Sequence, residues 1–385
     1  MSENKTKKRI YMRRALAIVA LVAVLIASLG FMNRFLCIPV TPNQSKVINL
    51  HKEPADSIDV LLIGSSATYT NFASAYAYEL NGFTSYPYAL AGSTCTMWKP
   101  ALQDALRTQD PKLVVIDAFT GGYEPIEIKT RSNQAYTVMA HMPFSDEKVE
   151  IARELSASID DSSTLSYIIP FLRYHIRVPS NLLKIKDRIE MERYGASPLR
   201  GIQNMSYVRK LKKPDEASFS SEAVPLDPDT ESIIRNFMDY CKSRDIKVLF
   251  VKYPSVLTYE DPEEMLINLR ANRILEIADE YGFYTLNLQK SFYEIGFDEK
   301  KDFYNHGHAN VRGQKKTTAY LANYIQNTLN VEPSELNDDL KAAWDESIAY
   351  YHAYYEFSES LIEAGDKRDL WDSPELLQEL SGMIQ

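Results

Sequence analysis

The 385-residue sequence predicts an α/β fold, a three-layer α/β/α arrangement in which helices cover both faces of a parallel sheet. Short apolar runs alternate along the chain with longer segments of helical periodicity, and this alternation is typical of βα units. A composition of 45% hydrophobic and 25% charged residues is that of a folded chain with a sizeable core. The expected strands are 60–63, 85–90, 113–118, 248–251 and 283–288, and the expected helices are 72–81, 97–108, 229–244, 263–281 and 314–327.

The N-terminal region has the length and composition of a membrane-spanning helix. Residues 15–33 carry no charged side chain and come close to the thickness of a hydrocarbon core of about 30 Å. Residues 1–14 carry six basic side chains and one acidic one, so the positive-inside rule predicts a cytoplasmic N-terminus and an extracellular domain. A cleaved signal peptide is the alternative, because small residues at 27–30 offer a cleavage site. We expect an uncleaved single-pass anchor that places residues 15–33 in the bilayer of the plasma membrane.

The rest of the chain divides into three expected regions. Residues 34–56 contain three prolines, which disfavour helix and predict an extended linker. The α/β domain follows over 57–330, with a polar, helix-leaning insertion at about 125–225 expected over the C-terminal edge of the sheet. The tail, 331–385, has the pattern of one or two amphipathic helices, whose aromatic residues are explained by packing, with stacking on a glycan as the alternative.

Charge and cysteine content exclude two classes of protein. The net charge is −9, and the +5 of residues 1–14 leaves −14 for the remaining chain. So acidic a domain disfavours nucleic acid as a partner, because phosphates need a basic surface. Cys37, Cys95 and Cys241 are too few and too scattered for a disulfide framework or a thiolate zinc site, and at most one disulfide could form.

Two candidate functional segments follow expected strands. The first strand leads into Gly64, Ser65 and Ser66, at a turn where α/β sheets commonly bind ligands. A serine hydroxyl there is either a helix N-cap or a nucleophile. The second strand leads into Gly92, which either forms a plain turn or lets a backbone N–H approach a developing oxyanion.

A third candidate segment, 302–313, precedes the last helix of the domain and holds two of the six histidines. His308 in this loop would meet the crevice that contains Ser66 and could accept the serine proton. A metal site of His306, His308 and Asp302 is the alternative, although no further cluster of ligand residues completes it. Otherwise His306 is a solvated loop residue.

In their order and placement, residues 59–66, 91–92 and 302–313 resemble the SGNH/GDSL hydrolases, in particular the membrane-anchored exported branch that acts in D-alanylation of lipoteichoic acid. The resemblance extends to 173–177 and 252–255 and covers most of 57–330. It implies an SGNH-hydrolase-like, flavodoxin-like fold with Ser66 as nucleophile and His308 as general base. The backbone N–H groups of Ser66 and Gly92 would contribute to the oxyanion hole, and neither a metal nor a diffusible cofactor is expected.

The chain departs from this family pattern in two places. Asn305 stands where the family has an aspartate, and an amide orients an imidazole without supplying the charge that stabilises imidazolium. Asp302 is a candidate substitute for that aspartate, and a Ser–His dyad oriented by Asn305 is the other solution. The family's glycine-x-asparagine-aspartate block is missing after the third strand, where Asp117 lies.

The resemblance implies a serine esterase or O-acyltransferase that works outside the membrane through an acyl-serine intermediate. Its expected substrate is a cell-envelope glycan or a teichoic-acid-like polymer. The alternative is an SGNH-fold module in which Asn305 has abolished catalysis and the crevice binds a glycan or a membrane-bound acyltransferase.

Overall fold

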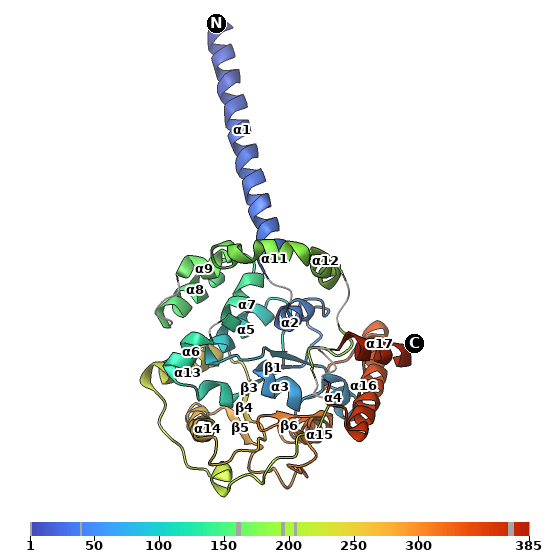
Figure 1. The fold of residues 1–385 in the computed structure, drawn as a ribbon. Coiled ribbons are helices and arrows are strands. Elements are labelled where there is room, and N and C mark those ends of the chain that lie inside the picture. Colours follow the sequence, from blue (N-terminus) through green and yellow to red (C-terminus); the bar gives the residue numbers. More distant parts are fainter. Residues whose placement is uncertain are drawn as a thin grey trace.

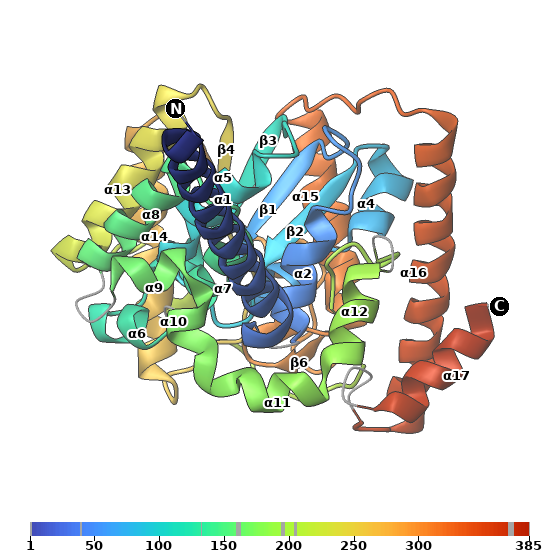
Figure 2. The same ribbon diagram turned by 90° about the horizontal axis from the view of Figure 1, so that it is seen from above.

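A five-stranded parallel sheet forms the centre of the computed structural model, which describes residues 2–38, 41–131, 133–158, 163–193, 197–203, 206–368 and 373–384. The strand order is β2-β1-β3-β4-β5 (Figures 1 and 2), one of the common doubly wound orders. The strands are β1 (Val60–Gly64), β2 (Ser85–Ala89), β3 (Leu113–Asp117), β4 (Val248–Lys252) and β5 (Tyr284–Asn287). All four strand pairs are parallel, which confirms the α/β prediction.

Alternate residues of each strand pack against opposite layers of helices. Leu61 and Ile63 belong to one buried cluster, together with residues of α5 (Trp98–Ala105), α13 (Pro228–Ser243) and α14 (Pro262–Glu280). Val60 and Leu62 belong to a second cluster with residues of α4 (Ser74–Asn81) and α15 (Val311–Asn327). The sheet is therefore buried on both faces, as its continuous apolar runs predict.

The expected helix over 72–81 is present as α4, which begins at Ser74, and a short helix that was not predicted, α3 (Ser66–Asn71), precedes it. Phe72 and Ala73 are extended between them, with φ −138° and −114°. The Phe72 side chain is buried, and the Ala73 N–H donates to Thr318 Oγ1 at 2.9 Å instead of continuing a helix. The extended residues thus separate α3, which begins at Ser66 directly after β1, from α4.

The predicted extended linker at 34–56 is wrong. The long helix α1 (Ser2–Phe31) continues as a π-helical segment η1 (Met32–Cys37), and α2 (Pro42–Leu50) follows. The Thr41 side chain caps α2 by accepting from Gln44 N at 3.3 Å. Pro42 occupies the first turn, where its missing N–H would have no partner in the helix, so this proline starts a helix instead of preventing one.

The insertion is helical as predicted, and its later helices surround the base of α1 (Figure 1). Asn181 Nδ2 donates to the carbonyls of Leu36 and Cys37 at 2.9 and 3.0 Å, and Asn33 Oδ1 accepts from Phe171 N at 2.8 Å. The end of α1 is thereby held to the domain. The segment comprises α6 (Pro125–Thr130), α7 (Asn133–His141), α8 (Asp146–Ser158), α9 (Thr164–Ile168), α10 (Pro170–Tyr174), η4 (His175–Arg177), α11 (Val178–Leu183) and α12 (Ile185–Arg193).

The first helix extends away from the domain (Figure 1). Within the described ranges, Lys7–Cys37 is the one helix long and apolar enough to cross a membrane, with a mean hydropathy of 2.7 in its most apolar window. A signal sequence has the same features. The structure thus contains the predicted N-terminal apolar helix.

The tail forms α16 (Asp338–Ala364) and α17 (Pro374–Ile384), as its pattern predicts. Trp344, Tyr351, Tyr354 and Phe357 are buried, so packing explains these aromatic residues. The guanidinium of Arg200 lies 3.8 Å from the centre of the Trp344 ring. All three cysteines are free and buried, so the one disulfide that the sequence allowed is not formed.

Candidate active site

Ser66 is the first residue of α3, at the carboxyl end of β1. The two neighbouring serines divide the roles that the sequence left open. Ser65 is the N-cap, since its Oγ accepts from Ala67 N at 3.4 Å. The Ser66 hydroxyl is therefore not used as a cap, and its Oγ lies 2.6 Å from His308 Nε2.

His308 and Asn305 lie on a short antiparallel hairpin formed by β6 (Phe303–Asn305) and β7 (His308–Ala309). His308 Nδ1 lies 2.8 Å from Asn305 Oδ1, which also accepts from the Gly307 backbone N–H at 3.0 Å. The hairpin leads into α15, which Asn310 caps through Arg312 N and Gly313 N at 3.0 and 3.3 Å. The structure thus brings together residues that are 242 positions apart, as the sequence predicted.

These hydrogen bonds define the tautomer of His308. The Gly307 N–H can only donate, so it fixes the amide oxygen of Asn305 on the side facing the imidazole. Nδ1 must then carry the proton that Asn305 Oδ1 accepts. The lone pair of Nε2 consequently faces the Ser66 hydroxyl, which is the arrangement that a general base requires.

The imidazole of His308 is neutral at physiological pH. Burial and, to a lesser extent, the neighbouring His306 lower the pKa of His308 from 6.5 to about 4. No carboxylate contributes to this pKa, because the residue that orients the ring is an amide. His308 is therefore always available as a proton acceptor near pH 7, but its protonated form is poorly stabilised.

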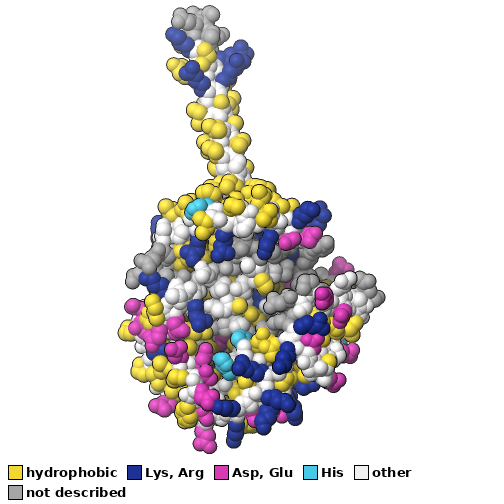
Figure 3. Space-filling view, viewed as in Figure 1, with side chains coloured by type: hydrophobic (Ala, Val, Ile, Leu, Met, Phe, Trp, Pro, Cys, Tyr) yellow, Lys and Arg dark blue, Asp and Glu magenta, His cyan; other side chains and the backbone are white. Residues whose placement is uncertain are grey.

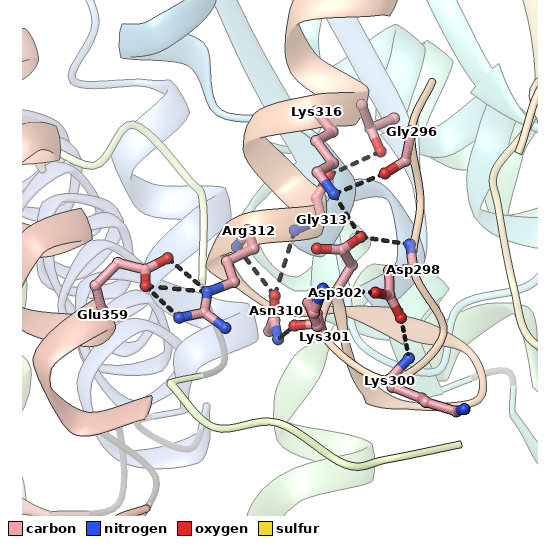
Figure 4. Close-up of polar contacts among 11 residues, drawn as sticks. Gly296, Asp298, Lys300, Lys301, Asp302, Asn310, Arg312, Gly313, Lys316 and Glu359 are labelled. Carbon is pink, nitrogen blue, oxygen red and sulfur yellow. Dashed lines mark hydrogen bonds and ion pairs between the residues drawn. The ribbon is translucent and has the colours of Figure 1, made fainter. Parts of the chain in front are cut away.

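Asp302 does not take the place of the missing triad carboxylate, contrary to the sequence hypothesis. Its buried side chain accepts from Asp298 N at 2.6 Å and pairs with Lys316 Nζ at 2.7 Å (Figure 4). The Asp302 carbonyl accepts from Asn310 N at 2.9 Å. Asp302 therefore fastens the loop to the start of α15, and Asn305 orients His308.

Gly92 lies in a loop that is tied to the Ser66 turn. Leu90 N and Ser93 Oγ both donate to the Gly64 carbonyl, at 3.1 and 2.6 Å. Gly92 has φ +72°, a left-handed conformation that suits glycine. Within the described parts of the chain, the N–H groups of Gly92 and Ser66 donate no hydrogen bond to the protein.

Two residues that the sequence did not point to, both far from this loop in the chain, hold it by hydrogen bonds. Asn43 Oδ1 accepts from Ala91 N at 2.9 Å, and Gln134 Nε2 donates to the Ala91 carbonyl at 2.7 Å. The two amide side chains are also joined, with Asn43 Nδ2 donating to Gln134 Oε1 at 3.1 Å. They come from α2 and α7, and no sequence signal links those helices to the loop after β2.

Asp117, at the end of β3, holds the Ser66 turn through hydrogen bonds. Its Oδ2 accepts from Ser65 Oγ at 3.0 Å and from Thr68 Oγ1 at 3.5 Å, and its Oδ1 accepts from Phe119 N at 3.1 Å. Burial raises the pKa of Asp117 to about 6, against the opposing effect of these hydrogen bonds. Asp117 is thus a positioning residue for the turn.

Gly64 leaves no room for a side chain beside these groups, so we predict that Gly64→Ala destabilises the fold. A Cβ at this position would meet Thr68 Oγ1 at 2.1 Å and the Asp117 Cβ at 2.5 Å. Overpacking of this kind costs about 1–3 kcal/mol, which for a domain of this size corresponds to a fall in Tm of roughly 2–4 °C. The matched control is Gly382→Ala in α17, where nothing lies within 4 Å. Equal Tm values for the two variants would contradict the close packing of this turn.

The serine and histidine open into a small pocket of about 100 Å³. Its apolar wall consists of aromatic and aliphatic side chains, and Glu264 and His306 supply its polar end. Burial raises the pKa of Glu264, while His306 acts in the opposite direction. The apolar lining residues are Phe119, Tyr123, Tyr253, Pro254 and Leu257.

Comparison with protein-family models, curated proteins and solved structures finds no match to this chain. The function must therefore be argued from the site itself. The alternative metal site of His306, His308 and Asp302 is not assembled, since the described residues contain no group of three His, Cys, Asp or Glu side chains suited to an ion.

Proposed function

We propose that this chain is a membrane-anchored serine esterase or O-acyltransferase of the SGNH/GDSL type. The observation that carries the proposal is the 2.6 Å hydrogen bond between Ser66 Oγ and His308 Nε2, with Nδ1 held by Asn305. Hydrogen bonds connect a nucleophile to a base and the base to an orienting group, and all three lie next to a pocket. Acyl transfer through a covalent intermediate requires this arrangement.

The reaction would proceed in two proton-balanced halves. Ser66 Oγ attacks the acyl carbonyl carbon while His308 Nε2 takes the hydroxyl proton, and the N–H groups of Ser66 and Gly92 stabilise the oxyanion. The tetrahedral intermediate collapses to acyl-Ser66, and His308 returns the proton to the leaving alcohol. Water or an acceptor hydroxyl then loses its proton to His308 and attacks the acyl carbonyl. As the second tetrahedral intermediate collapses, the bond to Ser66 Oγ breaks and His308 returns that proton to Ser66 Oγ.

Asn305 sets the strength of this catalyst. The amide keeps His308 in the reactive tautomer but leaves the imidazolium without a neighbouring negative charge in a buried site. Such a dyad favours acyl donors with good leaving groups, because these donors demand less charge development at the imidazole. We therefore expect activated esters to be the better substrates.

The pocket favours a short acyl group. Its volume of about 100 Å³ is well below the range of about 300–1,000 Å³ typical of pockets for drug-sized ligands. Three aromatic side chains, Phe119, Tyr123 and Tyr253, are among its lining residues, and Glu264 adds a hydrogen-bond acceptor to the lining.

The apolar helix supports a place for this chemistry outside the plasma membrane, on a cell-envelope glycan or teichoic-acid-like polymer. Residues 1–14 are basic and 15–33 uncharged, so the N-terminus is expected in the cytoplasm and the domain outside. The hydrogen bonds from Asn181 to the Leu36 and Cys37 carbonyls hold the catalytic domain close to the anchor. Tethering raises the effective concentration of envelope substrates at the site.

Hydrolysis of p-nitrophenyl esters of increasing chain length by the full-length protein tests the proposal. We expect kcat/KM to be highest for the acetate and butyrate and at least about tenfold lower for the octanoate, a difference of about 1.4 kcal/mol in transition-state binding. A flat dependence on chain length would contradict the acyl pocket, and hydrolysis no faster than buffer for every ester would contradict the enzyme.

The second candidate is a non-catalytic module that uses the same crevice to bind a glycan or a membrane-bound acyltransferase. The neutral side chain of Asn305 favours this candidate, because an amide lacks the negative charge that a catalytic triad uses to stabilise imidazolium. This module would bind envelope glycan without turning over any of the esters.

A further inference from the structure

A cavity of about 590 Å³ lies against the base of α1, at the membrane-proximal end of the domain. Gly30, Asn33 and Arg34, at the end of the apolar helix, line one side of it. Because the proposed span ends at residue 33, these residues lie where the hydrocarbon core gives way to lipid headgroups. The cavity is therefore at headgroup depth and separate from the pocket at Ser66.

The cavity is lined by more cations than anions. Arg34, Lys52, Arg107 and Lys148 line it, against the single carboxylate of Glu192. Glu192 is already paired with Arg34 at 2.6 Å and with Arg188 at 2.7 Å. The surplus of positive charge at the wall is complementary to an anion.

Lys148 is the most informative of these cations. Its side chain is 3% exposed, and its Nζ donates to the Met142 carbonyl at 2.8 Å. Across the described ranges, no carboxylate lies within ion-pair distance of this ammonium group. Burial lowers the pKa of Lys148 to about 8, with Asp104 acting in the opposite direction, so the group is still mostly charged at neutral pH. A buried ammonium without a counter-ion is costly, and a bound anion would offset that cost.

The nearby Asp104 does not supply this counter-ion. It lies behind the cavity wall and is bound by Arg107 at 2.6 Å, by His51 at 2.8 Å and by the Tyr88 hydroxyl at 2.7 Å. His141, which also lines the cavity, is neutral because burial lowers its pKa to about 3. The charge facing the cavity therefore remains positive.

The surface around the cavity is suited to a bilayer. Phe144, Ile176 and Leu183 are 77%, 75% and 87% exposed. Figure 3 shows hydrophobic side chains gathered around the base of α1 and Lys and Arg side chains directly beneath them, the order expected at a membrane interface. Residues 164–193, which contain α9 to α12, carry six basic and three acidic side chains in a chain whose net charge is −9.

From these observations we propose that the cavity at the base of α1 binds the phosphate group of an anionic lipid from the leaflet that faces the domain. Lys148 and Arg107 would hold the phosphate, while Phe144 and the exposed residues of α11 contact the acyl region. The proposal rests on the membrane anchoring proposed above, and it is independent of the chemistry at Ser66.

Lipid retention by the full-length protein tests this site. Protein in micelles with equal amounts of phosphatidylcholine and phosphatidylglycerol is examined by native mass spectrometry, and we expect one phosphatidylglycerol to be retained in preference. Lys148→Met should lower that preference by about tenfold or more, since it removes the buried charge. Lys52→Gln, at the half-exposed rim, should lower it too and covers the case in which Lys148→Met does not fold. Lys252→Met is the matched control, because Lys252 is also buried and donates to Asn272 Oδ1 at 2.7 Å, away from the cavity.

The outcomes separate the possible sources of the anion. If inorganic phosphate or glycerol phosphate displaces phosphatidylglycerol at equal concentration, the cavity binds phosphate, but a lipid is not its ligand. That result would overturn the proposal of a lipid site. Equal retention of the two lipids, or an unchanged preference in both charge variants, would overturn the site and leave this face to a protein partner. A chain that does not float with phosphatidylcholine vesicles would instead refute the anchor.

Discussion

Ser66→Ala is expected to lower kcat for p-nitrophenyl acetate by a factor of about 10³ or more. The substitution removes the Oγ that faces His308 Nε2 at 2.6 Å, so the acyl-enzyme cannot form. The N–H groups of Ser66 and Gly92 stay in place, and for this reason some residual rate above buffer is expected. The measurement is the initial rate of ester hydrolysis by the full-length protein.

Ser65→Ala is the matched control for this change. Ser65 is the neighbouring serine, but its Oγ donates to Asp117 at 3.0 Å and caps α3, away from the histidine. We expect this variant to lose about 1 kcal/mol of stability and to keep most of its kcat. A Ser65→Ala variant that loses as much activity as Ser66→Ala would contradict the assignment of the nucleophile.

Asn305→Asp is expected to raise the plateau rate by about ten- to a hundredfold, because the opposite change in a serine protease triad costs about 10⁴. A carboxylate facing Nδ1 would stabilise the imidazolium that forms when Ser66 gives up its proton. It would also raise the pKa of His308 from its low value of about 4. The pH–rate profile of the wild type should therefore stay flat down to about pH 5 and fall through pH 4, and that of the variant should fall at a higher pH.

Asn305→Ala completes this comparison. This substitution removes the group that accepts from His308 Nδ1, so the Nδ1–H tautomer is no longer fixed. We expect the rate to fall, and we expect the pH at which the rate declines in acid not to rise. Profiles for Asn305→Asp and the wild type that coincide in both plateau and midpoint would show that Asn305 does not act on His308.

The sheet and its layers could be predicted because most of the strands are short, largely apolar runs between helical segments. Val60–Gly64 and Leu113–Asp117 are buried along their whole length, and the sequence places both within a residue of their observed ends. The segment 34–56 could not be predicted in this way. Its prolines are as compatible with the first turn of a helix as with extended chain, and the packing that decides between them comes from α7, far along the chain.

The sequence predicts the serine–histidine pair at the centre of the site, but not the residues that hold the surrounding loops in place. Ser66 directly follows a buried strand, and His308 shortly precedes a helix. Both lie in segments that resemble known motifs, so their contact could be expected. Asn43 and Gln134 act through a loop that neither adjoins in sequence. Asp302 lies near His308 in the chain, but its side chain pairs with Lys316 in α15 and does not orient the imidazole.

Covalent labelling with a fluorophosphonate probe, mapped by peptide mass spectrometry, tests the central claim most directly. The probe reacts with a serine only when a base activates it beside an oxyanion hole. We expect one adduct per chain, on Ser66, that disappears in Ser66→Ala and forms more slowly in Asn305→Ala. A folded wild type that takes up no label, or that takes it up on another serine, would contradict the account.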